Sequence, residues 1–151
     1  MQKTTSPLEA HLGYWMRFVS NRVSDEFQSA IETCGVSLSE WVALRTLYDH
    51  DSASHGTLIE ALGMTKGAVS KLVARLEEKA LVAREGDEGD ARVVLLRLTD
   101  AGRALVPRLA DLADANDRKF FGHLSAAQQA DLRRLFEEIV RLHALSEVPV
   151  R

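Results

Sequence analysis

The chain has 151 residues, of which 46% are hydrophobic and 27% are charged, and its formal net charge is −3. The length suits one domain, or one core with helical extensions, and the composition excludes a largely disordered chain. No apolar run approaches the roughly 20 residues of a membrane span and the N-terminus lacks the apolar core of a secretory signal, so we expect a cytoplasmic protein.

Residues 6–35 predict a long amphipathic helix. Ser6, Pro7 and Glu9 form a capping-box pattern at its start, and Gly35 provides a stop at its end. Such a helix is too long for one small core, so we expect its ends to pack against another copy of the chain. Its apolar face consists of Leu8, Leu12, Trp15, Met16, Val19, Val23, Phe27 and Ile31.

Two shorter helices are expected next. Ser39 is the predicted N-cap of a helix over residues 40–50, with Trp41, Leu44, Leu47 and Tyr48 facing inward. Residues 51–54 form a polar link, and residues 55–62 predict a short helix that ends at Gly63.

The following helix, within residues 64–82 and capped by Thr65, has two contrasting faces. Val69, Leu72, Val73 and Leu76 recur at the spacing of one buried stripe. Small side chains permit close approach to a surface, and hydroxyl and basic groups donate to phosphates and base edges. This pattern is typical of a helix that lies in the major groove of DNA. The opposite face carries Gly67, Ala68, Ser70, Lys71, Ala74 and Arg75, with Lys66 on its flank.

After this helix the hydrophobic period changes to that of strands. Residues 82–85 and 91–98 predict a β-hairpin joined by the turn Gly-Asp-Glu-Gly-Asp, which would form a wing beside a helix-turn-helix. Two further helices follow. Thr99 caps the first, in which Pro107 should produce a kink, and Ser125 with Gln128 forms a capping box for the second.

This order of elements resembles the MarR family of bacterial transcription regulators over nearly the whole chain. The most specific segment pairs Asp90 and Arg92 in the wing with an aliphatic strand that ends at Leu98, Thr99 and Gly102. The segments that support the resemblance are LSEWVALRTL, GMTKGAVSKLVARLEEKALVAR and DARVVLLRLTDAG.

The resemblance implies a mainly α fold with a small β-wing, a winged helix-turn-helix flanked by N- and C-terminal dimerisation helices. Residues 37–103 would form the DNA-binding region, and residues 1–36 and 104–151 the helical dimerisation region. An obligate homodimer would bind double-stranded DNA at a pseudo-palindromic operator, with half-sites on the order of 34 Å apart. We expect a repressor without a cofactor, released by a small aromatic or phenolic ligand.

The resemblance also implies which residues contact DNA. Arg75 would anchor a phosphate, Arg92 would enter the minor groove, and Asp90 would orient the wing or pair with a basic group. Asp87 and Glu88 depart from the more basic wing tip of many relatives, and Ala80 stands where glycine is common. The contacts expected from the helix are those of Thr65, Lys66, Gly67, Ala68, Ser70, Lys71 and Arg75.

A ligand site is expected on the first two helices, which in the family help to wall a crevice between the two regions. The candidate residues are Trp15, Arg17, Phe18, Trp41 and Arg45, with an arginine holding the anion of an aromatic carboxylate or a phenol. The alternative for both tryptophans is core packing, because aromatic side chains at helical spacing mostly fill cores.

The sequence also leaves room for a redox, a metal-binding or a protein-binding role. Cys34 is the single cysteine, so no intramolecular disulfide forms, and it is either a redox-sensing thiol or an inert buried one. His50, Asp51 and His55 approach a metal cluster, although solvation at helix ends explains them better. A helical dimer that binds a protein partner without DNA is the competing class. No nucleophile motif or phosphate-binding loop supports an enzyme.

Overall fold

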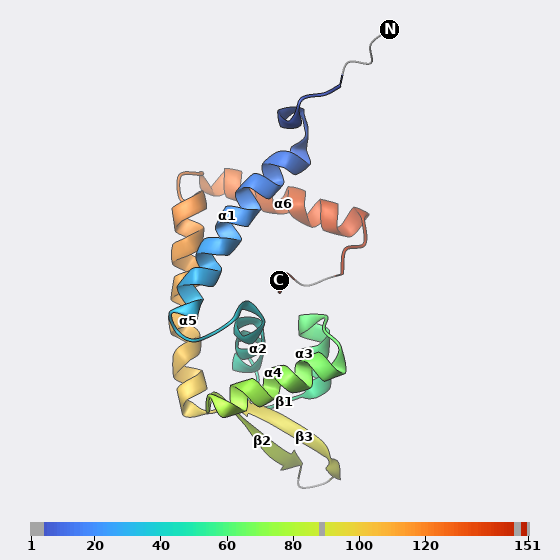
Figure 1. The fold of residues 1–151 in the computed structure, drawn as a ribbon, viewed down its shortest axis with the longest axis vertical. Helices are drawn as coiled ribbons and strands as arrows, with labels where there is room; N and C mark the ends of the chain where they lie inside the picture. The colour runs from blue at the N-terminus through green and yellow to red at the C-terminus, as the bar shows by residue number, and fades with distance from the viewer. Residues whose placement is uncertain (1–4, 88–89, 147–148, 151) are drawn as a thin grey trace.

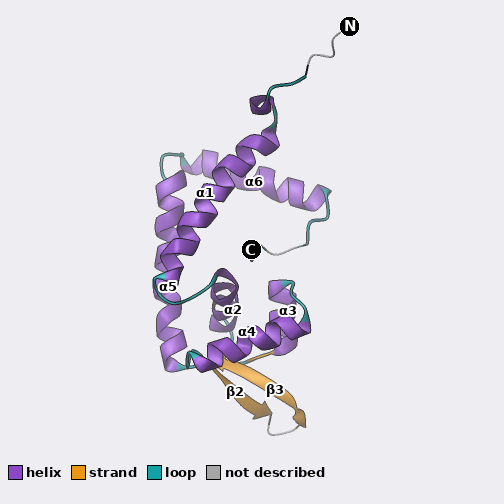
Figure 2. Cartoon of the chain, in the orientation of Figure 1, coloured by secondary structure: helices purple, strands orange, loops and turns teal. Residues whose placement is uncertain are grey.

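The computed structural model describes residues 5–87, 90–146 and 149–150, with the backbone alone for residue 87 and residues 90–93. Helices dominate, and the strands form one small antiparallel sheet of order β1-β3-β2, which confirms the predicted fold class (Figure 2). The elements are a 3-10 turn η1 (Leu8–Ala10), α1 (Leu12–Glu32), α2 (Leu38–Tyr48), β1 (Ala53–Ser54), α3 (His55–Leu62), α4 (Lys66–Glu78), β2 (Val82–Asp87), β3 (Asp90–Leu98), α5 (Asp100–Phe121) and α6 (Ala126–Leu142).

The elements gather at two opposite ends of the molecule. Figure 1 shows α2, α3, α4 and the sheet together at one end, and α6 with the first half of α1 at the other. Helix α5 runs along one side from the sheet towards α6, with α1 packed beside it. Asn116 on α5 donates a hydrogen bond to the carbonyl of Val23 on α1 at 3.0 Å, and Lys119 pairs with Glu26. Among the described helices, none is long and apolar enough to cross a membrane.

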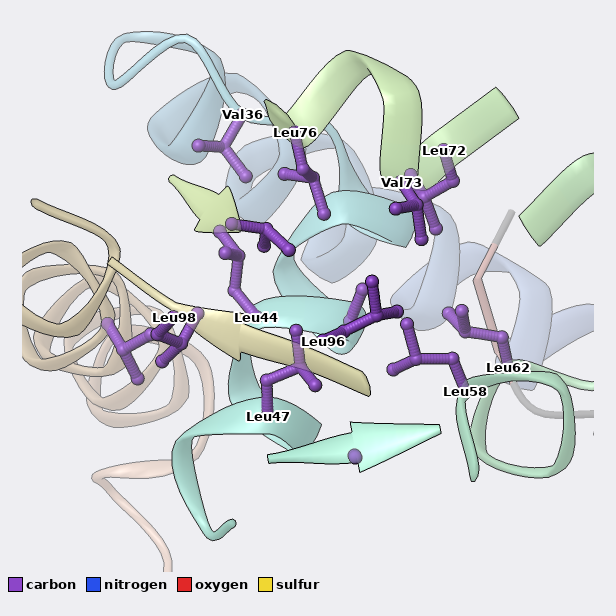
Figure 3. Packing of buried hydrophobic residues seen from close by; sticks show 14 of the residues in the cluster. Val36, Leu44, Leu47, Leu58, Leu62, Leu72, Val73, Leu76, Leu96 and Leu98 are labelled. Carbon is purple, nitrogen blue, oxygen red and sulfur yellow. The ribbon is translucent and has the colours of Figure 1, made fainter. Parts of the chain in front are cut away.

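The core lies at the end that contains the sheet. Leucines and valines from α2, α3, α4 and β3 point towards one another there (Figure 3). Val69, Leu72, Val73 and Leu76 are fully buried, which confirms the predicted stripe of α4. Along α1, by contrast, Ile31 is the one buried residue, so most of the predicted apolar face of this helix lies uncovered.

The predicted start of the first helix is wrong. Ser6 makes no cap, because the chain forms the short turn η1 after Pro7 and then extends at His11 with φ −98° and ψ 124°. The imidazole of His11 lies 3.1 Å from the carbonyl of Pro7, and the indole N–H of Trp15 donates to the carbonyl of Glu9 at 2.9 Å. These side chains bind backbone carbonyls that would accept backbone N–H groups if the helix were continuous.

The predicted N-cap of the second helix is also wrong, by two residues. Ser37 is the N-cap of α2, and Ser39 lies inside the helix. The hydroxyl of Ser37 accepts from the backbone N–H of Glu40 at 3.3 Å, and the Glu40 carboxylate accepts from the backbone N–H of Ser37 at 2.9 Å. This reciprocal capping box requires a glutamate or glutamine three positions after the cap, which Ser37 has and Ser39 lacks.

The segment predicted as a polar link contains a strand. Ala53 and Ser54 pair with Leu96 and Leu95 of β3, and Ala53 is buried. The hairpin strands were predicted correctly and extend to Asp87 and from Asp90.

The predicted caps of the later helices are confirmed. The hydroxyls of Thr65 and Thr99 accept from the backbone N–H groups of Ala68 and Gly102 at 3.2 and 3.1 Å. Gly63 ends α3 in the left-handed conformation at φ +60°, and Ser125 forms its capping box. Helix α5 continues through Pro107, and the kink stays a prediction.

Candidate nucleic-acid interface

The outer face of α4 carries small and basic side chains. Ala68 and Ser70 are half-buried and the other members of the face are exposed. In Figure 1, α4 crosses in front of α2 and α3, and the β2–β3 hairpin projects beyond it. We use the name outer face of α4 for Lys66, Gly67, Ala68, Ser70, Lys71, Ala74 and Arg75.

The cations of this face are unpaired within the part of the chain that the structure describes. Lys66, Lys71 and Arg75 have no carboxylate within ion-pair distance, whereas Glu77 on the same helix is paired with Arg84 at 2.7 Å. Beyond its own helix backbone, a Cβ at Gly67 would meet no described atom within 4 Å, so the surface there is open to a partner. The outer face therefore offers donors and positive charge to an anionic partner.

The base of the wing is attached to α4 and braced across its own strands. The ion pair between Arg84 on β2 and Glu77 on α4 joins hairpin and helix, and Arg97 pairs with Glu85 across the two strands. Asp90 and Arg92 belong to β3, but their side chains lie outside the described residues, as do Asp87 and Glu88 at the predicted acidic tip.

His55, the first residue of α3, lies close to this interface. Burial lowers the pKa of its imidazole, and the charges of Arg84 and Lys66 lower it further, while Glu77 acts in the opposite direction. The neutral imidazole is therefore favoured in the folded protein. In the part of the chain that the structure describes, no three metal-binding side chains are grouped together.

A groove of about 410 Å³ lies between α1, α2 and α5, and Pro149 near the C-terminus also lines it. Phe27 and Trp41 form an edge-to-face pair on its wall, with ring centroids 6.3 Å apart. Among the described residues that line the groove, Asp117 is the only charged one. The amide of Asn116 is already used by the carbonyl of Val23.

Of the residues predicted for a ligand site, Trp41 alone lines this groove. Trp15 and Phe18 lie against each other near the start of α1, with centroids 6.5 Å apart, and both are exposed. Arg17 is exposed on the same helix, and Arg45 pairs with Asp49 at 2.7 Å. The structure does not bring the five residues together.

Cys34 is half-buried at the end of α1, where it packs against the core. Its sulfur lies 4.0 Å from the hydroxyl of Thr33. This polar neighbour is uncharged, so it gives no electrostatic reason for a reactive thiolate.

Comparison with known proteins agrees with this arrangement. A model of the MarR family matches residues 35–93, the segment that contains the helix-turn-helix and most of the wing. Over 131 residues the chain is 30% identical to the HTH-type transcriptional repressor Rv2887 of Mycobacterium tuberculosis, a match that covers 87% of this chain and 94% of the repressor.

Solved structures have the same fold. BpsR of Bordetella bronchiseptica, whose DNA binding is regulated by 6-hydroxynicotinic acid, is 26% identical with a TM-score of 0.75, covering 90% of this chain and 97% of that one. The S. aureus MepR–DNA complex is similar in fold, with 23% identity, a TM-score of 0.76 and coverage of 87% and 97%.

The lowered pKa of His55 predicts that folding stability decreases as the pH falls. The unfolded state, with a pKa of about 6.5, binds this proton more readily, so the contribution is complete above that pH and is lost as the pH falls towards the lower folded pKa. Urea unfolding between about pH 8 and about pH 5.5 should show a weaker pH dependence in His55→Asn than in the unsubstituted protein. If stability depended equally on pH in the two proteins, His55 would not be the source of the pH dependence.

Proposed function

The chain belongs to the MarR family of DNA-binding transcriptional regulators, and from that premise we propose that it is a repressor that binds its operator as a homodimer. A repressor of this kind would meet its operator in the cytoplasm. The observation that supports the proposal most strongly is the positive charge on the outer face of α4, which no acidic side chain among the described residues pairs, beside small residues that permit close approach.

The DNA contact that we propose for each residue follows from its position on α4 or on the wing. Lys66, Gly67 and Lys71 occupy the N-terminal half of α4, where a helix in the major groove reaches base edges. Arg75, one turn further along, is suited to a phosphate. Ala68 and Ser70 complete the base-facing set, Thr65 holds the first turn through its cap, and Asp90 and Arg92 would act at the wing, with Arg92 in the minor groove.

A homodimer would cover the apolar surface at the other end of the molecule. Helix α6 is amphipathic, yet none of its residues is buried. Leu12 is 87% exposed and Val19 47%, although both belong to the apolar face predicted for the first helix. A two-fold interface through α1, α5 and α6 would cover these residues and set the two α4 helices on one DNA surface. We therefore assign dimerisation to residues 1–36 and 104–151 and DNA binding to residues 37–103.

The groove between α1, α2 and α5 is suited to a small aromatic effector. Its aromatic wall offers Phe27 and Trp41, and Asp117 can accept a hydrogen bond from a phenolic hydroxyl. The carboxylate of Asp117 repels a carboxylate ligand, so we favour an uncharged phenol over an aromatic acid. In one form of the dimer the two α4 helices would not fit successive major grooves, and an effector that binds this form more tightly would release the operator. A coupling free energy of about 1 to 3 kcal/mol between effector binding and DNA binding would be enough.

The first prediction concerns the outer face of α4. Lys71→Ala and Arg75→Ala should each weaken binding to a selected operator by about tenfold and reduce the salt slope of binding by about one, because each removes one cation from the DNA contact. Fluorescence anisotropy at several salt concentrations measures both quantities. Arg118→Ala removes an exposed cation from the far end of α5 and should change neither; an equal loss in all three variants would contradict local contact.

The second prediction concerns the dimer. Ile139→Glu places a charge on the apolar face of α6 and should convert the dimer to a folded monomer, because burying an unpaired carboxylate costs several kcal/mol, of order 3 or more. Analytical ultracentrifugation measures the change. Arg134→Glu alters the polar side of the same helix and serves as the control. A dimer that survives Ile139→Glu would place the interface elsewhere.

The third prediction concerns the effector. The chain has two tryptophans, so Trp15→Phe leaves Trp41 as the only one. In this variant 4-hydroxybenzamide should quench tryptophan fluorescence more strongly than 4-hydroxybenzoate, because Asp117 disfavours the carboxylate. Trp41→Phe should abolish the response. A response that persists in Trp41→Phe and disappears in Trp15→Phe would locate the ligand at the start of α1 instead.

A further inference from the structure

The C-terminal end of α4 is attached to the corner between α1 and α2 by one side chain. The ammonium of Lys79, the C-cap residue of α4, donates to the carbonyl of Gly35 at 2.7 Å. It also donates to both carboxylate oxygens of Glu40, at 2.9 and 2.7 Å. These three bonds use all the donors of the ammonium group, although 39% of the side-chain surface of Lys79 is exposed.

Glu40 is the one buried charged residue among those that the structure describes, with 2% of its surface exposed. Its carboxylate also accepts from the backbone N–H of Ser37, so it completes the N-cap of α2 while it holds Lys79. A buried carboxylate is costly unless it is paired and fully hydrogen-bonded. The buried carboxylate of Glu40, near the start of α2, is therefore paired with Lys79 at the C-terminal end of α4.

The segment that follows α4 is attached on its other side to the start of α5. The hydroxyl of Thr99 donates to the carbonyl of Ala80 at 2.6 Å, and its backbone N–H donates to the carbonyl of Leu81 at 3.1 Å. A Cβ on Gly102 would lie 2.1 Å from the Leu81 carbonyl oxygen, so only glycine permits this close contact. Ala80 itself has φ +55°, an uncommon conformation for a residue with a side chain.

Residues 79–81 therefore connect α4 to the corner between α1 and α2 and to the start of α5. We refer to these three residues as the junction. Helices α1 and α5 also line the groove and extend to the end of the molecule that carries the uncovered apolar surface. A shift of either helix at the groove would reach α4 through the junction.

We propose that Lys79 is a positioning residue that holds α4 at a fixed place relative to the corner between α1 and α2, and that this link carries movements of α1 to the outer face of α4. The proposal rests on the DNA-binding function proposed above for α4. Lys79 itself contacts no DNA in this scheme, because its donors are occupied by Gly35 and Glu40.

Four variants separate positioning from stability alone. Lys79→Met removes the ammonium and leaves Glu40 buried without it, whereas Lys79→Met with Glu40→Gln removes both charges. Glu40→Gln alone keeps a residue that can complete the capping box at Ser37, because glutamine serves there as well as glutamate. Lys79→Arg retains the charge and should restore the link. Arg134→Met breaks an exposed ion pair on α6 and serves as the matched control.

The decisive measurement is the distance between α1 and α4 within one chain. Spin labels at Ser29→Cys on α1 and Ala74→Cys on α4, both exposed positions, are introduced in a Cys34→Ser background and diluted with unlabelled protein. The distance distribution should broaden in Lys79→Met, Glu40→Gln and the double variant, and stay narrow in Lys79→Arg and Arg134→Met. Unfolding curves identify any variant that does not fold. If Lys79→Met does not fold, the distance distribution of Glu40→Gln still tests the link.

A second readout uses DNA. Lys79→Met should bind the selected operator about tenfold more weakly, within the range of allosteric couplings, while its binding to random duplex stays unchanged. Distance distributions and operator affinities equal to those of the parent protein would overturn the proposal, even if the variants were less stable. A parent protein that binds no operator would contradict the proposed function, yet the distances would still test the link.

Discussion

The burial of one helix stripe determines the orientation of the whole surface that we assign to DNA. Val69, Leu72, Val73 and Leu76 of α4 are fully buried against α2, α3 and β3. Each such side chain contributes roughly 1.5 to 3 kcal/mol when it leaves water. A helix held this firmly by one face must present the opposite face to solvent, and on α4 that face carries the small and basic residues.

Charge pairing then distinguishes the cations that hold the fold together from those left for a partner. Arg84, Arg97 and Lys79 are paired with acidic residues and hold the wing and the end of α4 in place. Lys66 and Lys71 have no such partner in the described part of the chain. A protein with a negative net charge can therefore still present a positive surface, because binding depends on where the charge lies.

Local patterns predicted most helices and caps, although the two caps predicted at Ser6 and Ser39 were wrong. Contacts between distant residues account for the other errors. Thr65 and Thr99 were identified as caps because the motif lies within four residues. Strand β1 was missed because its partners on β3 are far along the chain. Likewise, the residues around the two tryptophans do not indicate that Trp41 lines the groove and that Trp15 lies outside it. The bond between Lys79 and Glu40 joins residues 39 positions apart, so no local pattern predicts it. The DNA contacts themselves stay predictions.

The central claim is that two copies of the outer face of α4 read one duplex together. Hydroxyl-radical footprinting on a duplex selected from random sequence by the protein tests it most directly. The account predicts two protected half-sites related by a dyad, with centres about 10 base pairs apart or a multiple of that spacing. A single protected half-site, or binding no stronger than to random duplex, would contradict it.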